Sequence, residues 1–145
     1  MPFVIAVRAR CVGLATGAWR LGCAAWFLAV VERGLRKDPV PRVAARIGVR
    51  VADGVDGEVR AQMPHDVWRA TIAARRVARG RGLRGRCLRE SLVVGALCRT
   101  RDPVLRIGVR RAPGGELLAH AWIELDGVTY DVESSSYSAL EPVAS

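Results

Sequence analysis

The stretch VLRIGVRRAPGGELLAHAWIELDGVTYD, residues 104–131, decides the fold. Apolar residues alternate with other residues over 104–111 and again over 117–125, which is the pattern of half-buried strands. A Pro-Gly-Gly triplet predicts a reversal between the two strands. Asp126-Gly127 predicts a two-residue type I′ hairpin that leads into a return strand over 128–133. We therefore expect an antiparallel sheet in the C-terminal part of the chain.

The sequence before these strands has the periodicity of helices. Apolar residues from Leu14 to Leu28, Ala18 and Ala25 among them, recur at steps of four and three, which predicts a buried helix ending by Gly34. Further helices are predicted over 64–78 and from residue 87 to about residue 99. Residues 42–60 fit either a short strand at 46–51 or the tail of a helix. Helices followed by a sheet predict an α+β fold, with N-terminal helices ahead of an antiparallel sheet.

Length and cysteine content limit the class of protein. A chain of 145 residues fits a single domain, with residues 1–63 as a helical N-terminal portion and residues 64–145 carrying a cysteine-bearing helix and the strands. The four cysteines include no CxxC pair, which argues against a zinc ribbon, a disulfide framework and a thioredoxin-type site. Residues 11–31 are apolar apart from Arg20, whose charge is costly at a bilayer centre. We expect a buried helix there and a cytoplasmic protein.

The charge is strongly positive and unevenly distributed. Lys and Arg number 23 against 14 acids, for a net charge of +9. Residues 69–111 hold 13 arginines against Glu90 and Asp102, whereas residues 112–145 hold six acids and no base. A positive face of this kind suits nucleic acid, an anionic membrane or an acidic polypeptide. A solvated helix face in an arginine-rich protein explains the same pattern equally well.

The predicted hairpin places a histidine and two carboxylates on one face of the sheet. Because the two-residue loop fixes the register, Trp122 is expected opposite Asp131, and His120 opposite Glu133. His120 and Asp131 are then diagonal neighbours, within reach of a hydrogen bond. The opposite face is apolar and core-like: Ala119, Ala121, Ile123, Tyr130 and Val132.

Cys87 is the candidate nucleophile. It follows a stretch rich in glycine and arginine and opens the helix CLRESLVVGALC. A helix N-terminus with Arg84, Arg86 and Arg89 nearby stabilises a thiolate. A cysteine so placed, with a histidine backed by an acid, provides the components of a Cys-His-Asp site. An ordinary buried cysteine is the simpler alternative, and Ser91, one turn further on, is expected to hydrogen-bond the preceding turn.

The segment CLRESLVVGALCRT…LRIGVRRAPGGELLAHAWIELDG resembles the leader peptidases of lasso peptide biosynthesis, and more broadly the transglutaminase-like, papain-related cysteine peptidases. In these leader peptidases a Cys-Leu-x-x-Ser-Leu helix precedes an Ile-Gly-Val-Arg strand and an Ala-His-Ala-Trp-x-Glu strand. The resemblance is dense over residues 87–131, about a third of the chain. It implies a catalytic core over residues 64–145 with Cys87 as nucleophile, His120 as general base and then acid, and Asp131 as orienting carboxylate. Glu133 competes with Asp131 for the third role.

The resemblance also implies a substrate and partners. The substrate is the leader peptide of a ribosomally made lasso precursor, and no metal or organic cofactor is expected. The short segment before residue 64 resembles the split, stand-alone form of the protease. That form implies a separate small leader-recognition protein and an ATP-dependent macrolactam synthetase as partners, and no contact with nucleic acid or membranes. Two alternatives stay open: another transglutaminase-like thiol acyltransferase, and a non-enzymatic basic module that binds nucleic acid.

Overall fold

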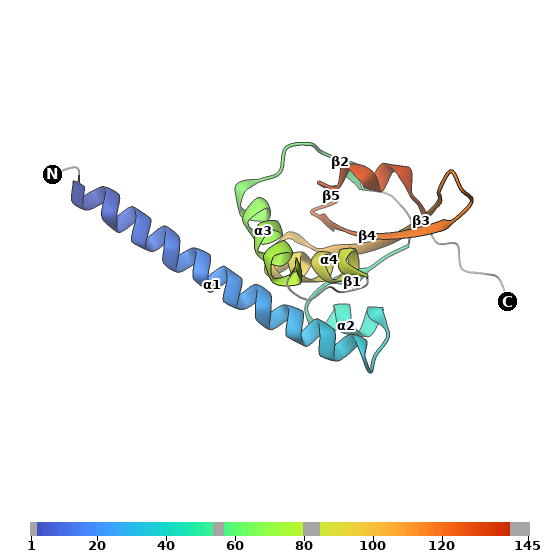
Figure 1. Ribbon diagram of the computed structural model, residues 1–145, viewed down its shortest axis with the longest axis horizontal. Helices are drawn as coiled ribbons and strands as arrows, with labels where there is room; N and C mark the ends of the chain where they lie inside the picture. Colours follow the sequence, from blue (N-terminus) through green and yellow to red (C-terminus); the bar gives the residue numbers. More distant parts are fainter. Residues whose placement is uncertain (1–2, 54–56, 80–84, 140–145) are drawn as a thin grey trace.

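The computed structural model describes residues 3–53, 57–79 and 85–139, which form an α+β fold (Figure 1). The helices are α1 (Phe3–Leu35), α2 (Val40–Arg46), α3 (His65–Arg79) and α4 (Arg86–Leu97), with 3-10 turns η1 (Arg99–Arg101) and η2 (Val132–Ser136). The strands are β1 (Arg50–Val51), β2 (Glu58–Val59), β3 (Val104–Arg111), β4 (Leu117–Leu125), β5 (Val128–Thr129) and β6 (Ser138–Ala139). Residues 42–60 thus contain both predicted alternatives in succession, the end of a helix and then a short strand.

The centre of the sheet follows the sequence prediction, and its edges do not. β3 and β4 have the predicted bounds and pair antiparallel. Asp126 and Gly127 have φ of 53° and 75°, the type I′ conformation, and bring Leu125 opposite Val128. The prediction of a purely antiparallel sheet is wrong at its edges, because β1 pairs parallel with β3 and β2 pairs parallel with β5. The strand order is β1-β3-β4-β5-β2, with β6 also paired to β3.

The return strand ends much earlier than predicted. β5 comprises only Val128–Thr129, and η2 occupies residues 132–136. The carboxylate of Asp131 accepts the backbone N–H of Glu133 at 3.0 Å, and its carbonyl accepts the hydroxyl of Ser134 at 2.6 Å. Local bonds of this kind compete with the hydrogen bonds of a sheet. The expected positions of the two carboxylates opposite residues of β4 are therefore wrong.

α4 lies at the centre of the core (Figure 1). One apolar cluster joins it to α1 and α3, and a second joins it to α2, β3 and β4. Leu92 and Val93, which are 0% and 1% exposed, belong to different clusters. A Cβ on Gly95 would lie 2.8 Å from Val49 and 2.9 Å from Ile123, so the glycine permits this close packing of helix and sheet. The position of α4 against the sheet is thus tightly determined.

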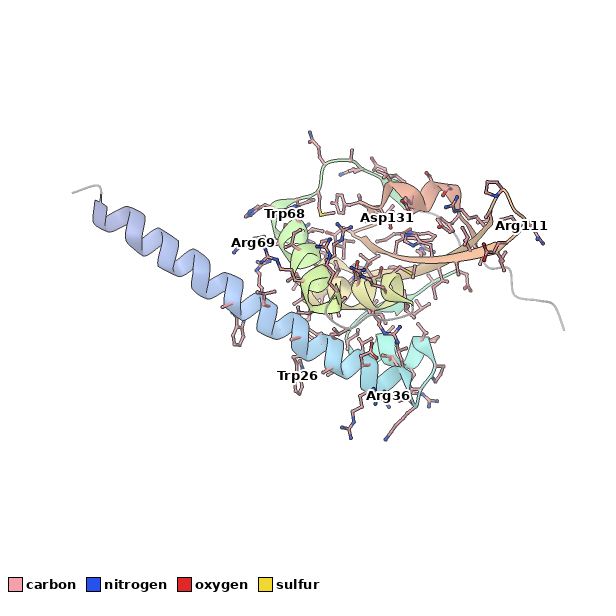
Figure 2. The ribbon with its side chains drawn as sticks, viewed as in Figure 1. Trp26, Arg36, Trp68, Arg69, Arg111 and Asp131 are labelled. Atoms are coloured by element: carbon pink, nitrogen blue, oxygen red, sulfur yellow. The ribbon has the colours of Figure 1, made fainter. Side chains whose placement is uncertain are left out.

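α1 is buried along one side, as predicted for a helix with one core-facing stripe, but two residues of the predicted stripe are not buried. Leu28 is 1% exposed, whereas Ala18 and Ala25, predicted on the same stripe, are exposed. Trp26 is 68% exposed and points away from the core (Figure 2). The N-terminal end of α1 extends away from the other elements (Figure 1). Within the described parts of the chain, no helix is both long enough and apolar enough to cross a membrane.

A buried ion pair lies on the His120 face of the sheet. Glu124, 2% exposed, accepts a hydrogen bond from Nε of Arg106 at 2.9 Å and another from the backbone N–H of Gly57 at 3.0 Å. Arg106 also donates to the carbonyl of Asp53 at 2.5 Å. The pair therefore ties the chain on both sides of residues 54–56 to the central strands.

We predict that Glu124→Ala lowers the free energy of unfolding by about 3–5 kcal/mol, because it leaves the buried Arg106 charge without its partner. Urea denaturation measures this loss. Replacing both residues by leucine removes both charges, so the double variant should regain much of the stability. A loss below about 1 kcal/mol for Glu124→Ala, the size expected of an exposed pair, would contradict the prediction.

Candidate active site

Cys87 lies in the first turn of α4, which begins at Arg86, one residue before the predicted start. Gly85 precedes the helix with φ of 67°, a left-handed conformation that glycine adopts without strain. The Cys87 side chain is half-buried and faces a cleft of about 380 Å³ that His120 and Asp131 also line. Most of the glycine- and arginine-rich stretch before Cys87, including Arg84, lies outside the described residues.

His120 connects the cysteine to the carboxylate. Its Nε2 lies 2.7 Å from Oδ2 of Asp131, and its ring also hydrogen-bonds the thiol of Cys87. Because Nε2 faces the carboxylate, Nδ1 is the ring nitrogen available to the thiol. The structure thus brings the three predicted site residues together. Glu133, the competing carboxylate, is exposed and gives Asp131 only its backbone N–H.

Asp131 reaches His120 by a different route from the one expected. The predicted diagonal pairing within the sheet is absent, because the chain leaves the sheet after Thr129. Asp131 instead begins η2 and lies between this turn and β4 (Figure 2). Three local bonds hold it there: its N–H donates to Oγ1 of Thr129, and its carboxylate and carbonyl accept from Glu133 and Ser134. One carboxylate oxygen is occupied by the turn, and the other faces the histidine.

The contacts between these groups shift their pKa values toward a charged pair. The hydrogen bond from His120 lowers the pKa of the Cys87 thiol, with burial opposing and the backbone N–H groups of Ala121 and Leu88 assisting. The bond to Asp131, followed by the bond to Cys87, raises the pKa of His120 to about 10. The pKa of Asp131 is lowered, chiefly by His120. Each of these shifts favours the charged form of its group, so the contacts favour a thiolate–imidazolium pair over the neutral pair.

Arg86 and Arg89, two of the three arginines predicted to stabilise the thiolate, pair with acids instead, and Arg84 lies outside the described residues. Arg86 pairs with Glu90 at 2.8 Å, and Arg89 pairs with Glu32 of α1. Neither contributes to the lowered pKa of Cys87. Glu90 follows Arg86 by four residues and is visible in the local sequence, whereas Glu32 belongs to α1 and only the tertiary structure brings it to Arg89.

Tyr137 is a site residue that the sequence did not reveal. Its ring centroid lies 5.1 Å from that of His120, and the buried Trp122 lies 6.0 Å from His120 on the same sheet face. The guanidinium of Arg110 sits 5.0 Å from the centre of the Tyr137 ring. A Cβ on Gly108 would lie 2.9 Å from Cβ of Tyr137, so the glycine leaves room for the tyrosine. Tyr137 comes from beyond η2, and no local pattern marks it.

Residues 39–145 match the family model described as the transglutaminase-like superfamily. The chain belongs to this superfamily. The matched range contains Cys87, His120 and Asp131 and begins after α1. Members of the superfamily are usually cysteine proteases or transferases, so this chain belongs to a family of cysteine peptidases and acyltransferases. The comparisons with curated proteins and with solved structures found no match.

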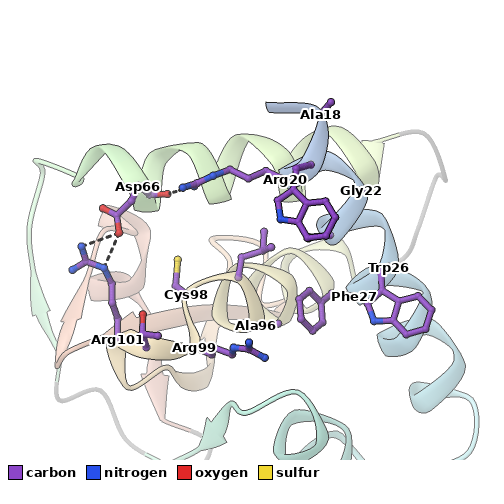
Figure 3. Close-up of a pocket in the computed structure, with 14 residues that line it drawn as sticks. Ala18, Arg20, Gly22, Trp26, Phe27, Asp66, Ala96, Cys98, Arg99 and Arg101 are labelled. Atoms are coloured by element: carbon purple, nitrogen blue, oxygen red, sulfur yellow. Dashed lines mark hydrogen bonds and ion pairs between the residues drawn. The ribbon is translucent and has the colours of Figure 1, made fainter. Parts of the chain in front are cut away.

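A larger pocket, of about 880 Å³, lies between α1 and the end of α4 (Figure 3). It does not contain a second cysteine–histidine site among its described residues. Cys23 and Cys98 line it, but its lining includes no histidine. Burial raises the pKa of Cys98 to about 11, so its thiol stays protonated near neutral pH. Asp66 at the rim is bound by Arg101 at 2.8 Å and accepts, through its carbonyl, from Arg20. Nowhere in the described residues are three or more His, Cys, Asp or Glu side chains grouped to hold a metal ion.

We predict that Cys87 alkylation by iodoacetamide has an inflection at lower pH than that of an ordinary thiol. The reagent attacks the thiolate, and the His120 hydrogen bond lowers the pKa of Cys87. In His120→Ala the hydrogen bond from His120 is lost, while burial still raises the pKa of Cys87. The inflection of the alkylation rate should therefore move to higher pH. Intact-mass spectrometry with peptide mapping measures the rate at each pH. Equal inflections in the two proteins would contradict the prediction.

We predict that Asp131 sets the pKa of His120. In a Cys87→Ala background the His120 pKa stays above its ordinary value of 6.5, because Asp131 is the largest cause of the increase. Adding Asp131→Asn leaves burial as the main influence, so the pKa falls below the ordinary value. NMR titration of the imidazole measures both, and His65→Gln assigns the signals of the two histidines.

Glu133→Gln is the matched control for this titration, because Glu133 is exposed and gives Asp131 only a backbone bond. It should leave the His120 titration close to that of the parent. A larger effect from Glu133→Gln than from Asp131→Asn would assign the carboxylate role to Glu133.

Proposed function

We propose that this protein is a cysteine peptidase that removes the leader peptide from a ribosomally made lasso peptide precursor. The main evidence for this chemistry is the position of the His120 ring between the Cys87 thiol and the Asp131 carboxylate. All three residues line the same cleft. Membership of the transglutaminase-like superfamily supports thiol acyl chemistry. The Cys-Leu-x-x-Ser-Leu and Ala-His-Ala-Trp-x-Glu motifs support a leader peptide as substrate.

In the proposed first step, the Cys87 thiolate attacks the carbonyl carbon at the end of the leader. The carbonyl oxygen becomes an oxyanion, and His120, as imidazolium, protonates the leaving nitrogen. The carbon–nitrogen bond then breaks, which releases the core peptide with a free amine and leaves the leader as a thioester on Cys87. Asp131 holds the ring in the orientation that presents Nδ1 to the sulfur.

Water resolves the thioester in the second step. His120, now neutral, takes a proton from water as the oxygen attacks the thioester carbon. The carbon–sulfur bond breaks, the leader leaves with a free carboxylate, and the thiolate–imidazolium pair is restored. No cofactor takes part in either step.

The start of α4 is positioned to stabilise the oxyanion. The first N–H groups of a helix have no intrahelical partner, and the helix dipole favours negative charge there. Cys87 lies in this first turn, so backbone N–H groups of α4 are close to the reacting carbonyl. We assign this part of the oxyanion hole to the helix backbone.

Both apolar and charged side chains line the cleft. Apolar lining comes from Met63, Val67, Val94, Ile123 and Tyr130, and charged lining from Arg75, Glu90 and Glu133. Such a cleft fits an extended peptide segment whose side chains contact both surfaces. We propose that a separate small leader-recognition protein delivers the precursor to this cleft, and that an ATP-dependent macrolactam synthetase uses the amine that cleavage exposes.

The test incubates the full chain with a candidate precursor peptide and its small recognition protein, in water enriched in oxygen-18. We expect the free core peptide and a leader whose new carboxylate carries the label, both identified by mass spectrometry. Cys87→Ala and His120→Ala should each lower the rate by at least about 10³-fold, since residues of a catalytic unit act together. Circular dichroism checks that the variants fold.

Other products would assign a different function. A leader joined to an added amine, without oxygen-18, identifies an acyltransferase. An intact precursor, with slow alkylation of Cys87, contradicts the peptidase proposal. Salt-sensitive binding of nucleic acid by such an inactive protein would favour a basic binding module.

A further inference from the structure

Ser91 makes a contact that the sequence did not predict. It lies one helical turn after Cys87, on the same side of α4, and is 9% exposed. Its hydroxyl donates to the carbonyl of Ala121 in β4 at 3.1 Å. A serine expected to bond its own helix instead joins α4 to the strand that carries His120.

The contact falls on an unpaired side of β4. β3 pairs with β4 along the whole strand, whereas β5 reaches only Glu124 and Leu125 on the other side. The N–H and C=O of one strand residue point in the same direction. Both groups of Ala121 therefore point to the side that β5 leaves open.

Residues of α4 take the place of the missing strand there. The Ala121 carbonyl accepts from Ser91 at 3.1 Å, and the Ala121 N–H is among the groups that lower the pKa of the Cys87 thiol. Cys87 and Ser91 are four residues apart, so one face of the helix meets both groups of a single strand residue. Ala121 is 4% exposed, which leaves its carbonyl little access to water.

We propose that Ser91 is a positioning residue for Cys87. Its hydroxyl holds Ala121 of β4 against the first turn of α4. The backbone N–H of Ala121 and the adjoining His120 therefore stay beside the Cys87 sulfur. The proposal deepens the proposed function and rests on it. Without the hydroxyl, the buried Ala121 carbonyl loses its partner and the strand shifts away from the helix. The thiolate then loses a charge-assisted hydrogen bond.

Several charged groups line the cleft that the sulfur faces. They are His120 of β4, Asp131 and Glu133 at η2, Arg75 of α3 and Glu90 of α4. Ser91→Ala changes none of these charges, so a change in the titration of Cys87 reports the position of the strand.

The test measures alkylation of Cys87 by iodoacetamide against pH in the full chain. Ser91→Ala should raise the inflection by about one pH unit, the scale of one hydrogen bond to a charged acceptor. Ser91→Thr retains a hydroxyl and should restore most of the shift. Thr71→Val is the matched control, because Thr71 lines the same cleft but bonds within α3 and to Met63. It should leave the inflection at the wild-type pH.

Thermal unfolding of the same variants separates positioning from stability. A lower Tm for Ser91→Ala with an unchanged inflection would overturn the proposal and leave Ser91 a structural residue. The shift should persist in a His120→Ala background, because the Ala121 N–H remains there; its disappearance would overturn the assigned route through Ala121. An upward shift in a protein that cleaves no precursor would reject the proposed peptidase function while retaining the role of Ser91.

Discussion

The hydrogen bond between Nε2 of His120 and Oδ2 of Asp131, 2.7 Å long, determines much of the arrangement around it. Asp131 can make this bond because the chain leaves the sheet after Thr129 and turns into η2. The same turn returns Tyr137 to the His120 ring, over the space that Gly108 leaves open. The early end of the return strand is therefore what completes the site.

α4 connects the hydrophobic core to the candidate active site. Its middle packs in both apolar clusters, and its first turn carries Cys87. Close contact through Gly95 fixes the helix against the sheet, and Ser91 fixes the strand edge against the helix. Because Cys87 and His120 come from these two elements, the packing of the core sets the distance between the sulfur and the imidazole.

Three arginines of the basic middle of the chain join elements of the fold to one another. Arg89, Arg101 and Arg106 form ion pairs with acids that lie outside residues 69–111. These pairs hold α1, α3 and β4 to the elements that carry the arginines. The lowered pKa of Cys87 comes from His120 and from backbone N–H groups, so the local richness in arginine was a poor guide to the electrostatics of the site.

The sequence by itself determined β3, β4, the Asp126-Gly127 turn and the start of α4, because alternation, turn chemistry and helix periodicity act over a few residues. It also named Cys87, His120 and Asp131, although the sheet register used to reach Asp131 was wrong. Only the tertiary structure decided where β5 ends, which edges run parallel, and what Tyr137 and Ser91 contact. Those outcomes depend on competition between sheet hydrogen bonds and bonds from segments distant in the sequence, and no local pattern records that competition.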